Sequence, residues 1–381
     1  VKTGSYDPAT DKYELERLGT SGTDYIAQSG ITKGGDNTFF LQFTIDYARR
    51  FDKHNVGGML LYTQREFKNN VLPSRNQGLS GRATYDYDQR YLFEFNFGYN
   101  GTERLGKGDR FEFFPAVSLG WLVSNEKFFE PLSDVVSSLK LRGSYGLVGS
   151  DETGPSNAPH FLYIDQVQVT GNGRPGFTTG ENLNVSYYGP VVQQWAVQNG
   201  GWERVKKLDV GFDMELFREL SITFDFFYDK RYNILLHREA WPQSLGFHEA
   251  KPWSNKGKVD NWGYEVSTNW RKQFTKDLTV DFRGTFTYTQ NKYIDVDEPI
   301  YPYVWQTATG KPLNRRNGYI AEGLFQSQEE IDNSPTQNLG SKPMPGDIKY
   351  RDVDGNGVID SKDQVMISKT ANMPRIQYGF G

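Results

Sequence analysis

The segment Tyr91-Leu-Phe-Glu-Phe-Asn-Phe-Gly-Tyr99 decides the fold, because its side chains alternate between two chemical types. The odd-numbered positions are all aromatic, whereas the even-numbered positions carry Leu92, Glu94, Asn96 and Gly98. Successive side chains of a β-strand point to opposite faces of a sheet. The segment therefore predicts a strand with one apolar face, which includes Phe95, and one more polar face, which includes Glu94.

The same alternation recurs along the chain and predicts about eleven strands with very little helix. Composition agrees, since 15% of the residues are aromatic and 40 are glycine. Only 131–138 and 327–331 are expected to form short helical turns. The other predicted strands are Phe39–Phe51, Asn55–Phe67, Leu79–Tyr87, Phe111–Val123, Leu139–Leu147, Leu208–Leu216, Leu220–Tyr228, Val259–Lys272, Leu278–Tyr288 and a last strand from Arg375.

The lengths of the strands and of their connections favour a transmembrane β-barrel. Most of the predicted strands reach the ~9–11 residues that cross a bilayer at a tilt, whereas soluble strands average ~5–6. Short turns alternate with long connections, as in outer-membrane barrels. A large soluble sheet protein that buries one face remains the alternative. The short or medium turns are 52–54, 88–90, 124–137, 218–219 and 273–277, and the long connections are 68–78, 100–110, 149–201, 230–258 and 290–374.

Several classes of protein are excluded or disfavoured. The net charge of −4 gives no basic surface for nucleic acid. No run approaches the ~18 apolar residues of a spanning helix. The chain has no cysteine, and its four histidines (His54, His160, His237 and His248) lack metal-ligand spacing. We therefore expect no enzyme.

One motif is specific for a metal. The segment 352–363, Asp-Val-Asp-Gly-Asn-Gly-Val-Ile-Asp-Ser-Lys-Asp, fits the twelve-residue calcium loop, with glycine at position 6. Its terminal residue is Asp rather than Glu, and no helix is predicted before it. We expect structural Ca²⁺, with Mg²⁺ as the alternative. The predicted ligands are Asp352, Asp354, Asn356, Asp360 and Asp363 through their side chains, and Val358 through its carbonyl oxygen.

Aromatic side chains are frequent in the long connections. Flat rings could stack on sugars or peptides, but they could equally pack the loops together or form the aromatic girdle of a barrel. The candidates for solute binding are Tyr187, Tyr188, Trp195, Trp241, Trp253, Tyr301, Tyr303 and Trp305.

Several motifs resemble the SusC/RagA family. These are Gly143-Ser-Tyr-Gly-Leu-Val-Gly149, Trp202-Glu203 followed by Leu208–Asp213, and Pro345-Gly-Asp-Ile-Lys-Tyr350, which runs into the calcium-type loop. The final segment, 374–381, also fits the family's next strand. The similarity spans the whole chain in order, and 345–363 is its most specific part.

The resemblance implies a TonB-dependent transporter in the bacterial outer membrane. It further implies active import of oligosaccharides or peptides, coupling to the TonB complex, and a SusD-like surface lipoprotein as partner. On this basis residues 1–381 are roughly half of a 22-stranded barrel, with 291–373 as a long extracellular loop. Because no leader precedes Val1 and an alternating run reaches Gly381, we expect a segment without the plug domain or the final strands.

Two other functions remain open at this stage. One is a secreted, calcium-stabilised β-protein that binds or cleaves glycans, and the other is a passive porin. Dependence on detergent would separate the first from a transporter, and a plug domain would separate the second.

Overall fold

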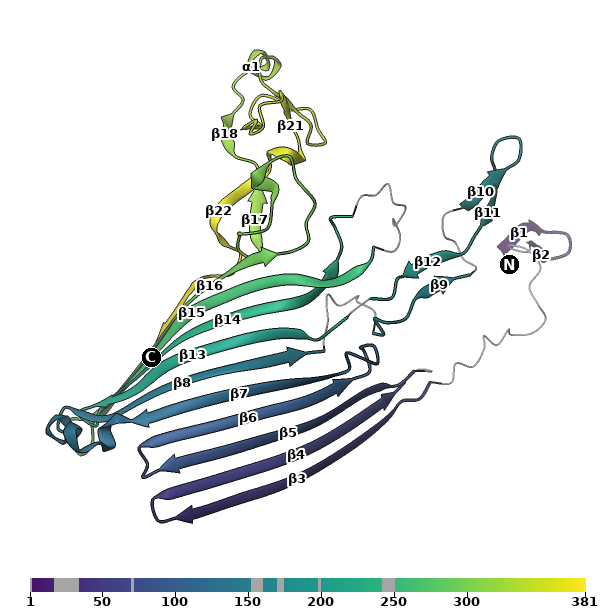
Figure 1. The fold of residues 1–381 in the computed structure, drawn as a ribbon. Coiled ribbons are helices and arrows are strands. Elements are labelled where there is room, and N and C mark those ends of the chain that lie inside the picture. Colours follow the sequence, from purple (N-terminus) through teal and green to yellow (C-terminus); the bar gives the residue numbers. More distant parts are fainter. Residues whose placement is uncertain are drawn as a thin grey trace.

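The computed structural model describes residues 2–16, 34–69, 72–151, 160–169, 175–197, 200–241 and 251–381. Its main element is an eleven-stranded antiparallel sheet (Figure 1). All eleven strands predicted from the alternation lie in it, so the all-β prediction is confirmed. In spatial order the strands are β23 (Ile376–Phe380), β16 (Thr279–Asp295), β15 (Trp253–Gln273), β14 (Leu220–His237), β13 (Glu203–Leu216), β8 (Val136–Ser150), β7 (Phe111–Leu122), β6 (Tyr91–Thr102), β5 (Ser74–Tyr87), β4 (His54–Lys68) and β3 (Asn37–Phe51).

The connections at one end of the sheet are mostly short turns and those at the other end are mostly long, as predicted (Figure 1). The exception is the connection expected at 68–78, which spans only 69–73 because β5 starts at Ser74. The turn between β5 and β6 shows why so few residues suffice. Asp88 and Gln89 both have positive φ, at 52° and 53°, as a tight hairpin with the right twist requires. The carboxylate of Asp86 accepts a hydrogen bond from the backbone N–H of Gln89 at 2.8 Å and holds the turn.

The register of the sheet separates an apolar face from a polar one. Phe95 lies opposite Ala83 on one side and Val117 on the other, all on the apolar face. Large apolar side chains on this face are exposed, for example Leu119 at 61% and Tyr145 at 55%. Water does not favour such a surface, whereas the hydrocarbon of a bilayer does.

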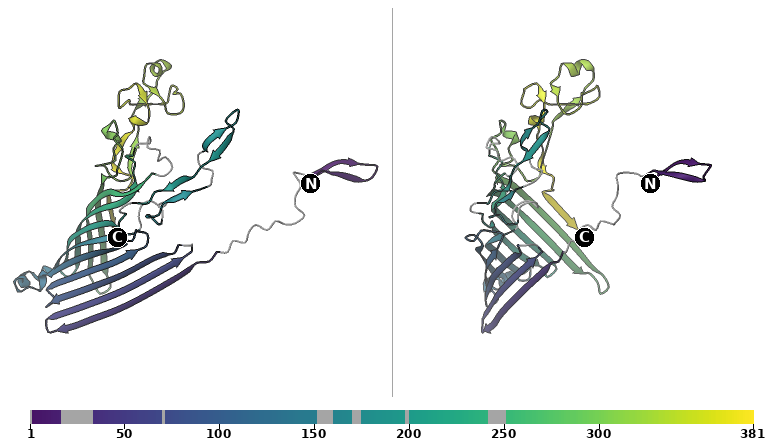
Figure 2. Two further views of the ribbon diagram at one scale, coloured as in Figure 1. Left: turned by 45° about the vertical axis from the view of Figure 1, so that its right-hand side comes forward. Right: turned by 90° about the vertical axis from the view of Figure 1, so that its right-hand side faces the viewer.

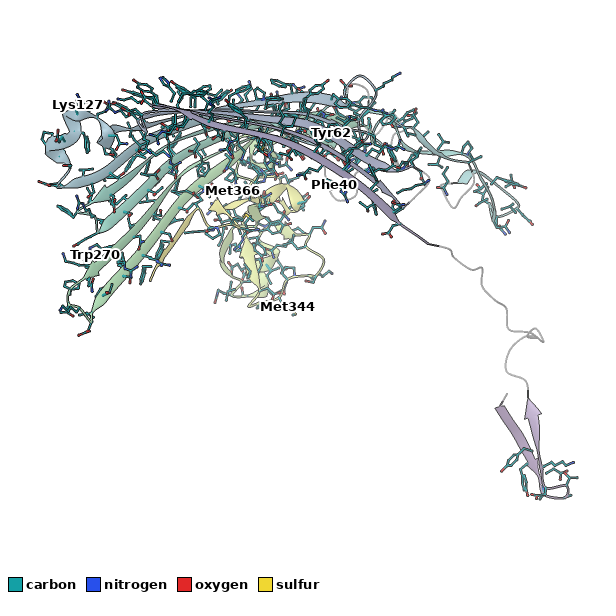
Figure 3. All side chains as sticks on the ribbon, turned by 90° about the horizontal axis from the view of Figure 1, so that it is seen from below. Phe40, Tyr62, Lys127, Trp270, Met344 and Met366 are labelled. Carbon is teal, nitrogen blue, oxygen red and sulfur yellow. The ribbon has the colours of Figure 1, made fainter. Side chains whose placement is uncertain are left out.

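The polar face is the hollow one. A cavity of about 780 Å³ is lined largely by its side chains, among them Asn55, Thr84, Glu94, Lys140 and Arg142. Seen from below, the sheet is curved, and the loop segment that carries Met344 and Met366 lies on its concave side (Figure 3). The sheet is thus a trough with a polar interior and an apolar exterior. Its curvature is visible from two further sides in Figure 2.

The connections contain short elements that the alternation did not predict. In the C-terminal connection, β17 (Arg315–Gly318) pairs with β22 (Val365–Ala371), β18 (Ala321–Leu324) with β20 (Ile348–Tyr350), and β19 (Thr336–Gln337) in parallel with β21 (Val358–Ile359). Strand β16 continues to Asp295, so this connection begins after the expected start at 291. Further short strands are β1 (Lys2–Asp7), β2 (Lys12–Glu16), β9 (Gln166–Gln168), β10 (Pro175–Thr179), β11 (Val185–Tyr188) and β12 (Val191–Gln194).

Helical structure is sparse, as expected. The turn expected at 327–331 is α1 (Gln328–Asp332), the single α-helix of the described residues. The turn expected at 131–138 lies earlier, in η2 (Lys127–Leu132) after η1 (Val123–Asn125), because β8 already begins at Val136. Ser327 caps α1, because its hydroxyl accepts a hydrogen bond from the backbone N–H of Glu330. No helix in the described part of the chain is both long and apolar enough to span a bilayer.

Candidate metal site and solute-binding loops

The acidic loop 352–363 is folded by its own carboxylates. It follows β20, contains β21 and ends in the single turn η5 (Ser361–Asp363). The Asp352 carboxylate accepts hydrogen bonds at 2.7 Å from the backbone N–H groups of Gly355 and Gly357. Both glycines have positive φ, 72° and 82°, so that the chain turns sharply around this carboxylate.

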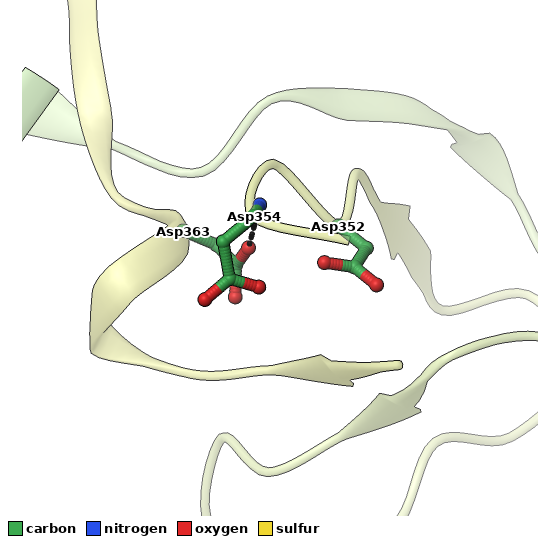
Figure 4. A group of neighbouring side chains, drawn as sticks. All are labelled: Asp352, Asp354 and Asp363. Atoms are coloured by element: carbon green, nitrogen blue, oxygen red, sulfur yellow. Dashed lines mark hydrogen bonds between the residues drawn. The ribbon is translucent and has the colours of Figure 1, made fainter. Parts of the chain in front are cut away.

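Three of the predicted ligands come together. Asp352, Asp354 and Asp363 each place one carboxylate oxygen within 4.8 Å of the other two (Figure 4). Asp363 is fully buried and accepts hydrogen bonds from the backbone N–H groups of Val353 at 2.7 Å and Asp360 at 2.8 Å. Carboxylate oxygens are the donors that Ca²⁺ and Mg²⁺ prefer, so the chemistry of this group fits either ion.

The other predicted ligands have different partners. The Asn356 side-chain oxygen accepts from the backbone N–H of Val358 at 2.8 Å, and its amide donates to Asp354 at 3.0 Å. One Asp360 oxygen accepts from the backbone N–H of Lys362 at 2.7 Å, which caps η5. Each of these oxygens has a further lone pair, and Asp360 has a second carboxylate oxygen, so both side chains could complete a calcium shell.

Hydrogen bonds are donated to the carboxylates of Asp352 and Asp354. The backbone N–H of Gly357, with those of Gly355 and Asn356, holds the pKa of Asp352 below its usual value. The Tyr303 hydroxyl is hydrogen-bonded to Asp354, which raises the pKa of Tyr303. The hydrogen bonds to Asp352 favour its ionised form, which is the form that binds a cation.

Two predicted solute-binding residues lie beside this loop. Tyr303 and Trp305 flank Val304 in the short turn η4 (Val304–Gln306), and their rings stack with centroids 4.6 Å apart and planes 7° from parallel. The Trp305 indole N–H donates to the carbonyl oxygen of Lys362 at 2.8 Å. The sequence placed the acidic loop and these rings in one long connection but gave no sign that they touch.

Trp253 occupies a different environment from the one expected. It is 8% exposed and belongs to a core that joins three connections, and its ring centroid lies 3.7 Å from that of His237. This placement gives Trp253 a packing role rather than a surface for solutes. The other members of the core are Leu105, Phe114, Leu162, Val197, Trp202 and Leu235.

The remaining aromatic candidates are spread over the connections. Tyr187, Trp195 and Tyr301 are exposed, at 50%, 38% and 37%. Trp241 stacks under the guanidinium of Arg238 at 5.6 Å. The backbone of Tyr188 lies in β11, but its side chain falls outside the described residues. The structure therefore brings Tyr303 and Trp305 together in one place.

An ion-pair network on the polar face was not singled out from the sequence. The Arg142 guanidinium lies 2.6 Å from the carboxylate of Asp225, 3.2 Å from that of Asp213 and 3.4 Å from that of Asp209. Strand alternation puts all four residues on the polar face, which is the signal that could have identified them. The network itself carries three carboxylates and one guanidinium.

Comparisons with known proteins agree with this geometry. Residues 1–340 match the family model described as TonB dependent receptor-like, beta-barrel. The chain is 27% identical over 317 residues to TonB-dependent receptor P3 of Formosa agariphila, covering 79% of this chain and 29% of that protein. It is 28% identical over 306 residues to TonB-dependent receptor SusC of Bacteroides thetaiotaomicron, covering 76% of this chain and 28% of that protein.

A solved structure shows the same fold. The RagAB peptide importer in its closed-closed state aligns with 91% of this chain and 39% of its own chain, with a TM-score of 0.67 and 16% identity. The fold therefore defines an outer-membrane β-barrel protein. More narrowly, the chain belongs to the family of TonB-dependent receptor-like β-barrels and is SusC/RagA-like, and it spans less than a third of the length of the curated relatives it matches.

Proposed function

We propose that the chain forms part of the barrel of a transporter that imports oligosaccharides or peptides across the outer membrane, with energy supplied through the TonB complex. The observation that carries this proposal is the two-faced trough, in which an exposed apolar exterior encloses a polar, ion-paired interior. The relatives support it, because they include a receptor named SusC and a peptide importer.

The proposal is tested by uptake in the parent bacterium. A strain that lacks the full-length gene should lose accumulation of a labelled oligopeptide or a labelled oligosaccharide, and the intact gene should restore it. An uncoupler of the inner-membrane proton gradient should abolish the same uptake. Uptake that persists after uncoupling would mean a passive porin, and a protein recovered without detergent from the culture fluid would mean a secreted glycan-binding or glycan-cleaving protein.

We further propose that the long connections bind a SusD-like surface lipoprotein. The connections 151–202 and 296–375 leave the same end of the sheet and are far longer than any turn at the other end. They offer a broad surface outside the membrane. Purification of the intact protein from its native membrane under mild detergent should recover a second subunit, and recovery of the barrel alone would contradict this partner.

We propose Ca²⁺ as a structural ion of the loop 352–363. The predicted site has oxygen atoms of Asp352, Asp354, Asn356, Val358, Asp360 and Asp363 within about 2.3–2.6 Å of one ion. A smaller, water-rich octahedral shell would identify Mg²⁺ instead. The ion would neutralise the carboxylates gathered in Figure 4 and fix the long connection that contains them. Calorimetric titration of the full-length protein with calcium, after chelation, should show one binding event.

A further inference from the structure

Three lysines stand in one row across four neighbouring strands of the sheet. Lys206 in β13 lies opposite Lys230 in β14, and Lys230 lies opposite Asp260 in β15. Asp260 in turn lies opposite Lys292 in β16. All three lysines are exposed. The row therefore carries three positive charges and one negative charge on four neighbouring strands.

The row belongs to the apolar, outward face. Lys206 lies two residues from Leu208, and Lys230 two residues from Tyr228 on their strands, so each shares a face with an outward side chain. The Tyr228 hydroxyl donates to the carboxylate of Asp260 at 2.8 Å, which places Asp260 on this face as well. These lysines consequently point away from the polar trough.

The row lies at or beyond the upper limit of the apolar band. Strand β14 starts at Leu220 beside a short turn, and Lys230 follows ten residues later. At about 3.4 Å per residue and a tilt of about 40°, this corresponds to a height of roughly 26 Å, against an apolar band of about 25 Å. Lys292 follows thirteen residues after the start of β16 at Thr279, which by the same arithmetic is roughly 34 Å above its own turn. Tyr228 and Trp262 lie opposite each other just below the row, where the aromatic girdle of a barrel is expected.

The protein itself leaves these charges unneutralised. Among the described residues, no carboxylate forms an ion pair with Lys206, Lys230 or Lys292, and Lys206 instead lies 5.7 Å from the centre of the Tyr232 ring. Lysines slightly further along β15 are paired, because Lys258 lies 3.7 Å from Asp295. Two lysines directly opposite each other destabilise a sheet, so folding alone does not account for the row.

We propose that Lys206, Lys230 and Lys292 form a binding row for the phosphate groups of lipids in the leaflet on the long-connection side. Long lysine side chains at this level extend towards the head groups, and an ammonium group binds phosphate as a point charge. The row is continuous with the lipid-facing surface, which argues for a lipid rather than a protein as occupant. The proposal rests on the membrane position of the barrel and is independent of which solute is imported.

Native mass spectrometry of the full-length protein tests this proposal. The protein is placed in phosphatidylcholine nanodiscs that contain either lipid A with both phosphates or the same lipid after removal of its phosphates. The wild type should retain the phosphorylated lipid preferentially. The variant K206Q/K230Q/K292Q should bind it roughly 100-fold more weakly, since each of the three lysines near a charged surface contributes a factor of about five.

A matched variant controls for net charge. K107Q/K207Q/K342Q removes three lysines that lie on a loop, on the polar face and in the C-terminal connection, and it should bind the phosphorylated lipid as the wild type does. Heat-modified migration on a gel confirms that each variant is folded. Equal retention of the two lipids by the wild type, an unchanged affinity in the row variant, or cross-linking of the row to a protein in native membranes would each overturn the proposal. Uptake by the row variant reports separately on the transport proposal.

Discussion

The assignment of the two faces is tested by placing one arginine on each of them. Phe95 and Asn96 are consecutive residues of β6, so their side chains point to opposite faces at nearly the same height. Phe95→Arg would put a charge into lipid, whereas Asn96→Arg would put it into the polar trough. The Asn96 amide lies 2.8 Å from the Glu94 carboxylate, so that an arginine there has an anionic partner within reach.

The expected magnitude follows from the depth of Phe95. Strand β6 begins at Tyr91 after a short turn, and Phe95 is its fifth residue. Phe95 thus lies four residue steps from Tyr91, so at about 3.4 Å per residue and a tilt of about 40° its height is roughly 10 Å, within a few ångströms of the middle of a band about 25 Å tall. An arginine at the midplane costs about 2–4 kcal/mol, so Phe95→Arg should lower the free energy of unfolding by this amount. Asn96→Arg should cost less than about 1 kcal/mol.

The assay is reversible unfolding of the full-length protein in phospholipid vesicles by guanidinium, followed by tryptophan fluorescence. Asn96→Arg is a better control than Glu94→Arg, because Glu94 is ion-paired with Arg82 at 2.7 Å and its replacement would remove that pair. Equal losses for the two variants, or a larger loss for Asn96→Arg, would refute the assignment of the faces.

Three further predictions concern the connections. Replacing both Asp354 and Asp360 by alanine should abolish calcium binding and make 296–375 more sensitive to limited proteolysis. The barrel should keep its heat-modified migration on a gel, and an unchanged calcium titration would contradict the metal site. Burial lowers the pKa of His160 below 6.5, so the folded state binds the proton less readily than the unfolded state. The contribution of His160 to the free energy of unfolding is therefore fully present above pH 6.5 and should be lost as the pH falls below this value. Thermal unfolding at pH 7.5 and 5.5 measures this loss, which should disappear in His160→Gln. Trp253→Ala should cost about 3–5 kcal/mol because it opens the core of the connections, whereas Tyr301→Ala at an exposed site should cost about 0.5 kcal/mol or less; similar values for the two would contradict the packing role of Trp253.

The strands were predictable because the bilayer imposes a simple rule on them. The side chains of every strand must alternate between lipid and interior. The sequence of a segment such as Tyr91–Tyr99 therefore indicates which side chains face lipid and which face the interior. The alternation of short and long connections follows equally directly from a barrel that projects from one side of a membrane. These constraints are local, and therefore a single chain reveals them.

The connections follow no comparable rule. The short strands between 296 and 375 pair across long intervals, as when Thr336 lies opposite Val358, and no period marks them in the sequence. The calcium-type spacing identified Asp352, Asp354 and Asp363, because one tight turn brings them together. It did not identify the contact between Trp305 and Lys362, and it did not place Trp253 in a core, because both depend on tertiary packing.

Every proposal made above depends on the orientation of the chain in the membrane. Labelling of single cysteines measures this orientation directly. The protein has no cysteine, so one introduced residue gives an unambiguous signal. Val304 is 82% exposed in a long connection, and Lys276 lies exposed in the short turn between β15 and β16. A membrane-impermeant maleimide should label Val304→Cys in intact cells and Lys276→Cys only after the outer membrane is permeabilised. Labelling of Lys276→Cys but not Val304→Cys in intact cells would contradict the account.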